Sequence, residues 1–316
     1  MVLVAIGALA GFLWFDQQSR DPGPLENETT LVIPRGTGVG AIADLLAEAG
    51  VINDSLLMVL RVRWRGEGRE LKAGEYVFVP GQSLDDVIDY LSDGRTVVRR
   101  ISVPEGLTTM AVLDLVRAAD GLTGEIEAEP AEGYLLPETY HYELGDTRTA
   151  VIQRMASAMT GTLEELWPNR DPGIPLDSPE EAVILASIVE KETGVPEERA
   201  HIAGVFFNRL ARGMPLQSDP TVIFALTEGK DELGRALTRA DWEYEHPYNT
   251  YRNAGLPPGP IANPGFDAIY AVLHPQETDD LYFVADGTGG HAFARTLDEH
   301  NDNVAAYREW LRNQEE

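Results

Sequence analysis

The feature that most constrains the fold is a pattern that occurs three times between residues 30 and 121: a β-rich run, a turn containing Pro and Gly, and an amphipathic helical segment. The three turns are Ile33–Gly36, Val79–Gly81 and Val103–Gly106. A glycine closes each helical segment, as is typical of the residue that follows a helix C-terminus. These glycines are Gly50, Gly94 and Gly121. The repeat predicts a region built from strand–turn–helix units.

The remainder, residues 99–316, predicts a mixture of helices and short strands, so the chain as a whole belongs to the α+β class. Leu281–Ala285 is a short apolar strand. Between Asp241 and Pro264 lies a loop rich in aromatic residues, Pro and Gly; loops of this length are usually functional. The expected helices are Ala150–Met159, Glu180–Glu192, Arg199–Arg212, Pro220–Leu226, Phe266–Leu273 and His300–Arg312.

The N-terminal run Met1–Phe15 carries no charge, and Asp16 ends it. As a helix it would span about 22 Å, which is short of the roughly 30 Å hydrocarbon core of a bilayer. No basic residue precedes the run and no A-x-A-like cleavage site follows it, although both are typical of a signal peptide. We interpret residues 1–15 as a membrane anchor and residues 16–29 as a linker. A buried core helix and a signal peptide are the alternatives.

Charge and composition exclude several function classes. With 25 basic and 52 acidic residues the net charge is −27, so nucleic acid is not an expected partner. The chain has no cysteine, which excludes disulfides, thiolate metal sites and a Cys nucleophile. The histidines lack paired zinc-ligand spacing and no G-x-S-x-G occurs. We therefore expect neither a metal nor a cofactor. The glycines of Gly36–Gly40 do not meet the spacing of a dinucleotide loop.

Glu192 is the residue with the clearest chemical signal. It ends the helix predicted from Pro179, and at 100° per residue it lies about 20° from Leu185 and about 40° from Ile188. A carboxyl group on an apolar face, near the negative end of the helix dipole, has a raised pKa and can serve as a general acid. Glu190 lies across the helix. The alternative is that Glu192 is merely the solvated end of the helix.

Further polar and aromatic residues predict a carbohydrate cleft around Glu192. Aromatic faces stack on sugar rings, while amide and carboxylate groups pair with sugar hydroxyls. Each residue taken alone is equally consistent with a turn or a helix cap. The candidate substrate-binding residues are Asn208, Gln217, Ser218, Asp219, Tyr248, Asn249, Tyr251 and His291.

The segment Ala186–Thr193 (ASIVEKET) resembles the signature of the endolytic murein transglycosylase family, the YceG-like proteins. Specific blocks from about residue 30 to 310 resemble the family in the same order. These blocks are Glu132–Tyr140, Val205–Leu210, Leu216–Val222, Tyr248–Tyr251, Gly255–Gly265 and Tyr282–Phe293.

The resemblance implies a lyase that cuts nascent peptidoglycan strands internally, between N-acetylmuramic acid (MurNAc) and N-acetylglucosamine (GlcNAc), and leaves 1,6-anhydroMurNAc ends. The second glutamate of E-K-E-T, which is Glu192 here, is then the catalytic residue. Such a protein is expected to be a single-pass protein of the inner membrane with its catalytic domain in the periplasm. It is expected to end strand elongation, and peptidoglycan synthases are candidate partners.

The implied organisation is an anchor at 1–15, a linker at 16–29, a small LysM-like α/β module at 30–98 and a larger mixed α+β catalytic domain at 99–316. A LysM-like module would bind glycan. It contains a basic stretch that is either part of a binding surface or a solvated loop face. The basic residues are Arg61, Arg63, Arg65, Arg69 and Lys72.

Two other functions are compatible with the sequence. A hydrolase would use a second carboxylate, Glu138 or Asp219, to activate water, whereas a transglycosylase would use these two residues to position the substrate. A non-catalytic scaffold would bind glycan strands and organise wall synthesis without cutting them.

Overall fold

In the computed structural model, residues 2–66 and 71–314 are described, and the chain divides into two compact units. The first unit comprises residues 1–100, 121–123 and 141–146, and the second comprises residues 101–120, 124–140 and 147–316. The division thus falls close to the predicted boundary after residue 98. The assignment of the first unit as LysM-like stays a prediction.

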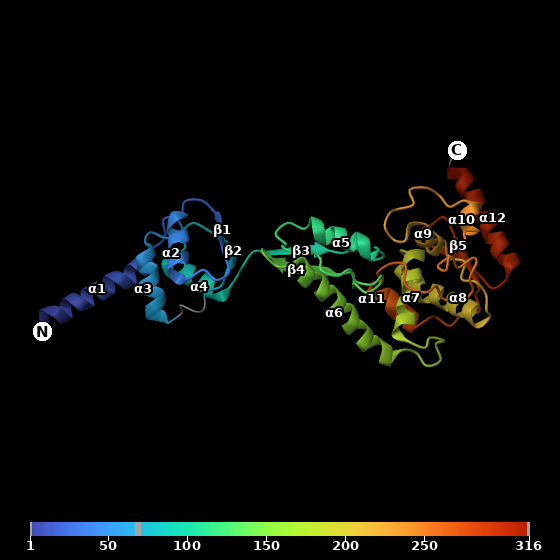
Figure 1. Ribbon diagram of the computed structural model, residues 1–316, viewed down its shortest axis with the longest axis horizontal. Coiled ribbons are helices and arrows are strands. Elements are labelled where there is room, and N and C mark those ends of the chain that lie inside the picture. Colours follow the sequence, from blue (N-terminus) through green and yellow to red (C-terminus); the bar gives the residue numbers. More distant parts are fainter. Residues whose placement is uncertain (1, 67–70, 315–316) are drawn as a thin grey trace. The chain divides into compact units, whose positions relative to one another are not determined.

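The first unit combines helices with one antiparallel strand pair, in which Thr29 lies opposite Phe78 and Ile33 opposite Gly74 (Figure 1). Its core consists of apolar residues from both strands and from the helices around them, among them Leu46 and Ile88. The elements are α1 (Val2–Arg20), β1 (Thr29–Ile33), α2 (Val39–Glu48), α3 (Ser55–Arg65), β2 (Gly74–Phe78) and α4 (Leu84–Asp93).

The predicted strand–turn–helix repeat is confirmed. Strand β1 is followed by α2, β2 by α4, and β3 (Val98–Ser102) by α5 (Thr109–Ala118). Gly94 is the left-handed C-terminal residue of α4, with φ 71°, a conformation that costs other residues more than glycine. At the other end of α4, Ser83 and Asp86 form a reciprocal capping box.

The stretch of arginines predicted as a solvated loop or a binding surface is instead a helix, α3, and Arg61 within it is buried. The Arg61 guanidinium donates to both carboxylate oxygens of Asp85, at 2.8 and 2.6 Å, and lies 3.2 Å from Asp16 of α1. Arg65 also pairs with Asp85. Acidic side chains therefore pair with two arginines of the basic stretch. Arg69, which also belongs to that stretch, lies outside the described residues.

Helix α1 extends to Arg20, so five residues predicted as linker are helical. Large apolar side chains along it are exposed, including Leu3 at 85% and Trp14 at 62%. Nevertheless, among the helices of the described chain none is both long and apolar enough to cross a bilayer. The predicted anchor at residues 1–15 therefore lacks structural support.

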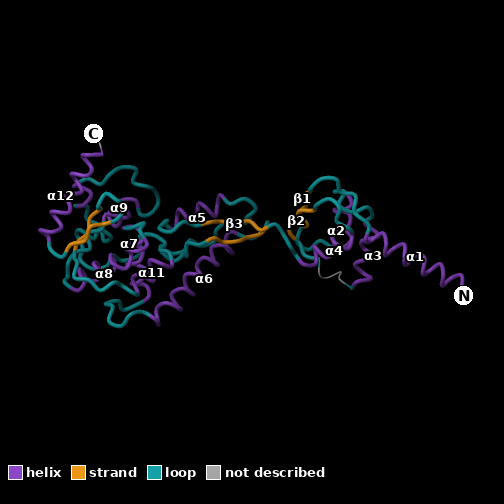
Figure 2. Tube along the Cα trace, turned by 180° about the vertical axis from the view of Figure 1, so that it is seen from behind, coloured by secondary structure: helices purple, strands orange, loops and turns teal. Residues whose placement is uncertain are grey.

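The second unit is dominated by helices, and Figure 2 shows its strands only as short segments. Strand β3 pairs with β4 (Thr139–Glu143), and the division between the units falls within both strands. Strand β5 (Tyr282–Ala285) pairs antiparallel with β6 (His291–Ala294). The predicted helices and the strand predicted at Leu281–Ala285 are confirmed, most of them with ends shifted by three residues or fewer; the helix predicted at Ala150–Met159 is longer and runs from Arg148 to Leu166. The remaining elements are α6 (Arg148–Leu166), α7 (Pro179–Glu192), α8 (Arg199–Ala211), α9 (Asp219–Thr227), α10 (Arg239–Trp242), α11 (Phe266–Leu273), β5 (Tyr282–Ala285), β6 (His291–Ala294) and α12 (Leu297–Gln314).

Helix α7 lies at the centre of this unit, packed against α8, α9 and α11 (Figure 1). Seven of its residues are buried, and they are not confined to one stripe: Ala182 and Val183 are buried as well as Leu185 and Ile188. A helix that is apolar nearly all round is a core helix. The sequence prediction of a single apolar stripe was therefore too narrow, although the stripe itself is correctly placed.

We predict that Arg61→Ala destabilises the first unit by about 2 kcal/mol, because it leaves the partly buried carboxylates of Asp85 and Asp16 without their shared cation. Urea unfolding monitored by circular dichroism would measure the change. Arg63→Ala is the matched control, since Arg63 is an exposed arginine of the same helix. Equal stability of the two variants would contradict the role given to Arg61.

Candidate active site

Glu192 is the last residue of α7, as predicted. The helix begins where the Ser178 hydroxyl accepts a hydrogen bond from the Glu181 backbone, with Pro179 in the first turn. It ends at Thr193, whose backbone is extended. Because the preceding turns of α7 are packed in the core, the position of the Glu192 side chain is fixed by the helix itself.

The Glu192 carboxyl group is half-buried and accepts a hydrogen bond of 2.5 Å from the Ser218 hydroxyl. The pKa of Glu192 is raised to about 7, mainly by burial and in part by the negative charge of Asp219. The hydrogen bond from Ser218 and the positive charges of His291 and Arg209 act in the opposite direction. A substantial fraction of Glu192 is therefore protonated at neutral pH, as general acid catalysis requires.

A buried hydroxyl network holds Ser218 in place. The Ser218 backbone N–H donates to Thr250 Oγ1 at 3.0 Å, and its carbonyl accepts from Thr221 Oγ1 at 2.6 Å. Thr221 and Thr250 share a hydrogen bond of 2.8 Å. Ser218 is also the N-cap residue of α9, but its hydroxyl does not cap that helix, since it donates to Glu192. Ser218 thus anchors the Glu192 carboxyl group from a fixed backbone.

Asp219, next to Ser218, is held by two aromatic side chains. Trp242 Nε1 donates to Asp219 Oδ1 at 2.9 Å, and the Tyr251 hydroxyl donates to the same oxygen at 2.7 Å. The two rings lie 6.0 Å apart at 35°. Neither of these hydrogen bonds uses Asp219 Oδ2, so that oxygen can accept from a ligand hydroxyl beside two aromatic faces. This arrangement suits a sugar.

Two basic side chains, Arg209 and His291, also act on the charge of Glu192. Arg209 is buried in α8 and donates to the carbonyls of Leu281 and Leu216, each at 2.6 Å; burial lowers its pKa. His291, at the start of β6, is bound through its Nδ1 to Glu198 at 2.7 Å. The site therefore contains carboxyl, hydroxyl, imidazole, guanidinium and phenol groups from four helices, a strand and a loop.

Glu190, two residues before Glu192, has a different environment. Its side chain is only 6% exposed and accepts from the Gly265 backbone N–H at 2.9 Å and from Arg199 at 3.4 Å. Burial raises its pKa also. Glu190 thus fastens α7 to the start of α11, which gives it a structural role. It lies across the helix from the Glu192 site, as predicted.

The structure brings only some of the predicted binding residues to Glu192. Ser218, Asp219, Tyr251 and His291 contact it or act on its charge. Among the hydrogen bonds of the described chain, none joins Glu192 to the side chains of the other candidates. Their assignment to the substrate stays a prediction. These residues are Glu138, Asn208, Gln217, Tyr248 and Asn249.

Two of these candidates have structural roles. The Asn208 amide donates to the carbonyls of Thr278 and Asp280, at 2.8 and 3.0 Å. Asn249 is fully buried, and its amide donates to the carbonyls of Trp242 and Tyr244. Asn249 thus shapes the loop that presents Trp242 and Tyr251. The sequence signal for both asparagines was polarity near a turn, which does not distinguish substrate contacts from backbone contacts.

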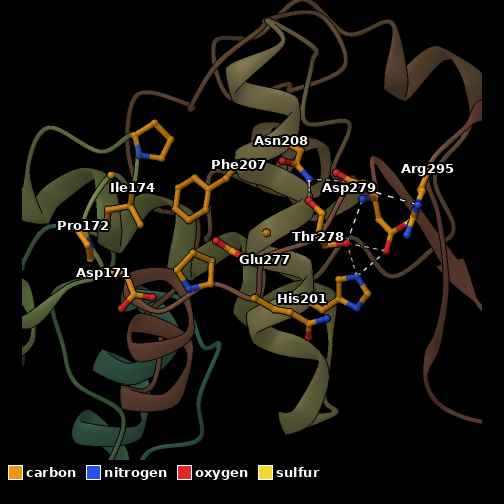
Figure 3. Close-up of a pocket in the computed structure, with 16 residues that line it drawn as sticks. Asp171, Pro172, Ile174, His201, Phe207, Asn208, Glu277, Thr278, Asp279 and Arg295 are labelled. Carbon is orange, nitrogen blue, oxygen red and sulfur yellow. Dashed lines mark hydrogen bonds and ion pairs between the residues drawn. The ribbon is translucent and has the colours of Figure 1, made fainter.

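A separate cavity of about 810 Å³ lies along a face of α8 (Figure 3). It is lined by Asn208, Phe207 and His201 of α8, by residues 171–175 and by the segment around Thr278. Glu192, Ser218 and Asp219 are not among its lining residues. A partly buried acid of its lining, Asp280, is paired with His201 at 2.8 Å. We place the candidate active site at Glu192, where the acid has the required properties, and not in this cavity.

Three contributors to the site escaped the sequence analysis: Trp242, Arg209 and Glu198. Trp242 stands in the long loop whose aromatic content was noticed, and Arg209 stands in a block that carries the family resemblance. Their contacts with the site depend on tertiary packing. Over the described ranges, no group of three or more His, Asp or Glu side chains is arranged to hold a metal ion.

Comparison with known proteins places these residues in a family context. The profile of the YceG-like family matches residues 31–306. A protein of Bacillus subtilis named endolytic murein transglycosylase is 33% identical over 95% of this chain and 91% of its own length. A protein of the same name from Streptococcus pneumoniae is 32% identical over 88% of this chain. This chain spans 58% of the length of that relative.

Among solved structures, a crystal structure of a yceG-like protein from Listeria monocytogenes superimposes with a TM-score of 0.55 and 31% identity. The match covers 88% of this chain and 99% of the other. It supports the mixed α+β architecture.

We predict that Glu192→Gln stabilises the protein increasingly as pH rises. Because the folded state binds this proton with a pKa near 7 and the unfolded state with one near 4.5, the wild-type protein loses stability as pH rises through this interval. Gln removes that cost, which is on the order of 1 to 3 kcal/mol above pH 7 after allowance for partial exposure.

Urea unfolding of both proteins between about pH 5 and 8 would measure the difference. Glu138→Gln is the control, because Glu138 is an exposed carboxylate and its removal should give no such trend. An advantage of Glu192→Gln that stays constant with pH would contradict the raised pKa.

Proposed function

The chain belongs to the YceG-like family, and we propose that it is an endolytic murein transglycosylase that cleaves the β-1,4 bond between MurNAc and GlcNAc within peptidoglycan strands. The observation that carries this proposal is Glu192: a carboxyl group with a pKa near 7, fixed by α7 and hydrogen-bonded to Ser218. The relatives named endolytic murein transglycosylase support the same activity.

In this function Glu192 is the general acid. Protonated at neutral pH, it donates its proton to the glycosidic oxygen that leaves with GlcNAc as the bond to C1 of MurNAc breaks. The C6 hydroxyl of the same MurNAc then attacks C1 and loses its proton to a base, for which the newly formed Glu192 carboxylate is available. The product carries a 1,6-anhydro ring, and no water is consumed.

Asp219, Trp242 and Tyr251 suit the task of holding a sugar next to Glu192. The Asp219 oxygen left by the two aromatic donors can accept from a sugar hydroxyl, and the neighbouring rings offer stacking faces. The charge of Asp219 also raises the pKa of Glu192, so it helps to keep the catalytic proton in place.

A hydrolase with the same fold would need a second carboxylate to activate water. Asp219 is the nearest candidate, but two donors already hold its Oδ1 and its charge supports protonation of Glu192. A pure glycan-binding scaffold would gain nothing from a carboxyl group with a raised pKa at the end of a core helix, which costs stability.

Location and partners belong to the same proposal. Nascent peptidoglycan lies outside the cytoplasmic membrane, so the second unit is expected to work there and to end strand elongation next to peptidoglycan synthases. The exposed apolar side chains of α1, such as Leu9 and Leu13, favour attachment to an apolar environment through residues 1–15.

We predict that Glu192→Gln lowers the rate of strand cleavage by about 10²- to 10⁴-fold, because the amide keeps the size of the side chain but has no proton to donate. The assay is digestion of glycan strands lacking peptide cross-links, followed by mass spectrometry of the new ends. Anhydro ends are lighter than hydrolytic ends by one water.

Glu165→Gln is the matched control, since Glu165 is an exposed carboxylate of α6 in the same unit and its removal should keep near wild-type activity. Glu190→Gln is a less suitable control, although Glu190 lies across the helix from Glu192. Its carboxylate accepts hydrogen bonds from the Gly265 backbone and from Arg199, so the substitution would also disturb packing. Full activity of Glu192→Gln would remove the basis of the proposal.

We predict that a reporter enzyme fused after Glu316 is active only on the outer side of the membrane. An alkaline phosphatase fusion, which requires an oxidising compartment, and a cytoplasm-active fluorescent fusion would report the two sides. Fluorescence without phosphatase activity would contradict the proposed location and leave the chemistry of Glu192 untouched.

A further inference from the structure

His291 is held in one orientation by Glu198. The His291 backbone N–H donates to Glu198 Oε1 at 2.8 Å, and Nδ1 lies 2.7 Å from Glu198 Oε2. A Cβ atom at Gly290 would lie 2.7 Å from Glu198 Oε1, so this approach requires glycine at that position. Although burial acts in the opposite direction, the hydrogen bonds from His291 hold the pKa of Glu198 below its usual value.

Glu198 is therefore a carboxylate, and Nδ1 of His291 is the nitrogen that carries the proton in this bond. The other nitrogen, Nε2, is left for chemistry, and no described hydrogen bond uses it. The Phe283 ring packs edge-on against the imidazole at 5.4 Å and limits its rotation. A carboxylate that fixes the tautomer of a histidine is the arrangement by which enzymes prepare an imidazole as a base.

This pair is connected to the catalytic carboxyl. Thr193 directly follows Glu192, and its hydroxyl donates to Glu198 Oε2 at 3.2 Å. The charge of a protonated His291 acts on Glu192, so the two groups share one electrostatic environment. The charged groups that face His291 are Glu198, Glu192 and Asp286. Two groups able to exchange protons, one acid and one base, thus belong to one site.

We propose that His291, oriented by Glu198, is the base that accepts the proton of the MurNAc C6 hydroxyl, while Glu192 acts as the acid alone. This inference rests on the proposed function. The bond between C1 and the leaving oxygen breaks, its electron pair stays on that oxygen, and the oxygen takes the proton of Glu192. The C6 oxygen bonds to C1, and its proton passes to His291 Nε2.

The step leaves Glu192 as a carboxylate and His291 as an imidazolium. Return of one proton from His291 to Glu192, directly or through water, restores the starting state without any other reactant.

His291→Asn is the decisive variant, because the Asn amide can replace Nδ1 as a donor to Glu198 but provides no counterpart to Nε2. We expect strand cleavage to slow by about 10²-fold or more. Among the residual products we expect a fraction of reducing MurNAc ends. Without its base the C6 hydroxyl attacks C1 more slowly, so water can attack C1 in its place. The pH–rate profile should change in shape, because the reaction no longer depends on this base.

Glu198→Gln is the second variant. It keeps the imidazole but removes the charge that fixes the tautomer, so we expect a smaller loss of rate, about 10-fold, and a pH–rate profile that differs from that of the wild-type protein. His201→Asn is the matched control. His201 is also paired with a carboxylate, Asp280, and stacks on Phe293, but it lines the separate cavity. It should leave rate, product ends and pH profile unchanged.

Thermal unfolding of each variant would identify misfolding. Should His291→Asn misfold, His291→Ala with added imidazole tests the same point, and recovery of anhydro ends supports the role of His291 as base. If folded His291 variants produce only anhydro ends with a wild-type pH profile while Glu192→Gln is inactive, the inference is wrong and the proposed function stands. If the wild-type protein forms no anhydro ends, the proposed function itself fails.

Discussion

The partial burial of one carboxyl group, that of Glu192, is the constraint on which the rest of the second unit depends. The acid must be kept away from bulk water so that it holds its proton, yet it must reach a substrate as large as a polysaccharide. Helix α7 meets the first requirement by packing against α8 and α11, so that the acid emerges directly from the core. The second is met because the carboxyl group lies at the end of the helix, where the chain turns away at Thr193.

The neighbouring elements follow from this placement. Ser218 and Asp219 reach Glu192 because α9 begins beside α7, and the Thr221–Thr250 contact fastens the long loop at the same point. Asn249 then keeps that loop in the shape that presents Trp242 and Tyr251. Glu190 and Glu192, only two residues apart, have separate roles because the helix turns them toward different neighbours: one toward Gly265, the other toward Ser218.

Local signals were sufficient to predict much of this. The helix α7 has a Ser cap, a Pro in its first turn and apolar periodicity, and the repeated Pro/Gly turns predicted β1–α2, β2–α4 and β3–α5. Contacts between segments far apart in the chain could not be predicted from the sequence. The basic stretch that contains Arg61 was predicted to be at the surface, and nothing in the sequence marked Arg209 as part of the site. Carboxylates or carbonyls from other segments allow both arginines to be buried. Polar residues in turns, such as Asn249, were predicted to bind a sugar. In the structure the Asn249 amide donates to the backbone carbonyls of Trp242 and Tyr244.

The position of Ser218 sets a limit on how stable this site can become. An N-cap hydroxyl normally contributes about 1 kcal/mol to its helix by accepting a backbone N–H. Here that hydroxyl donates to Glu192, and α9 begins without a side-chain cap. Ser218→Asp would supply the missing side-chain cap of α9 and would place a second negative charge against Glu192. Selection for thermal stability and selection for catalysis therefore oppose each other at Ser218. Substitutions intended to raise the thermal stability of the enzyme should be made at other positions.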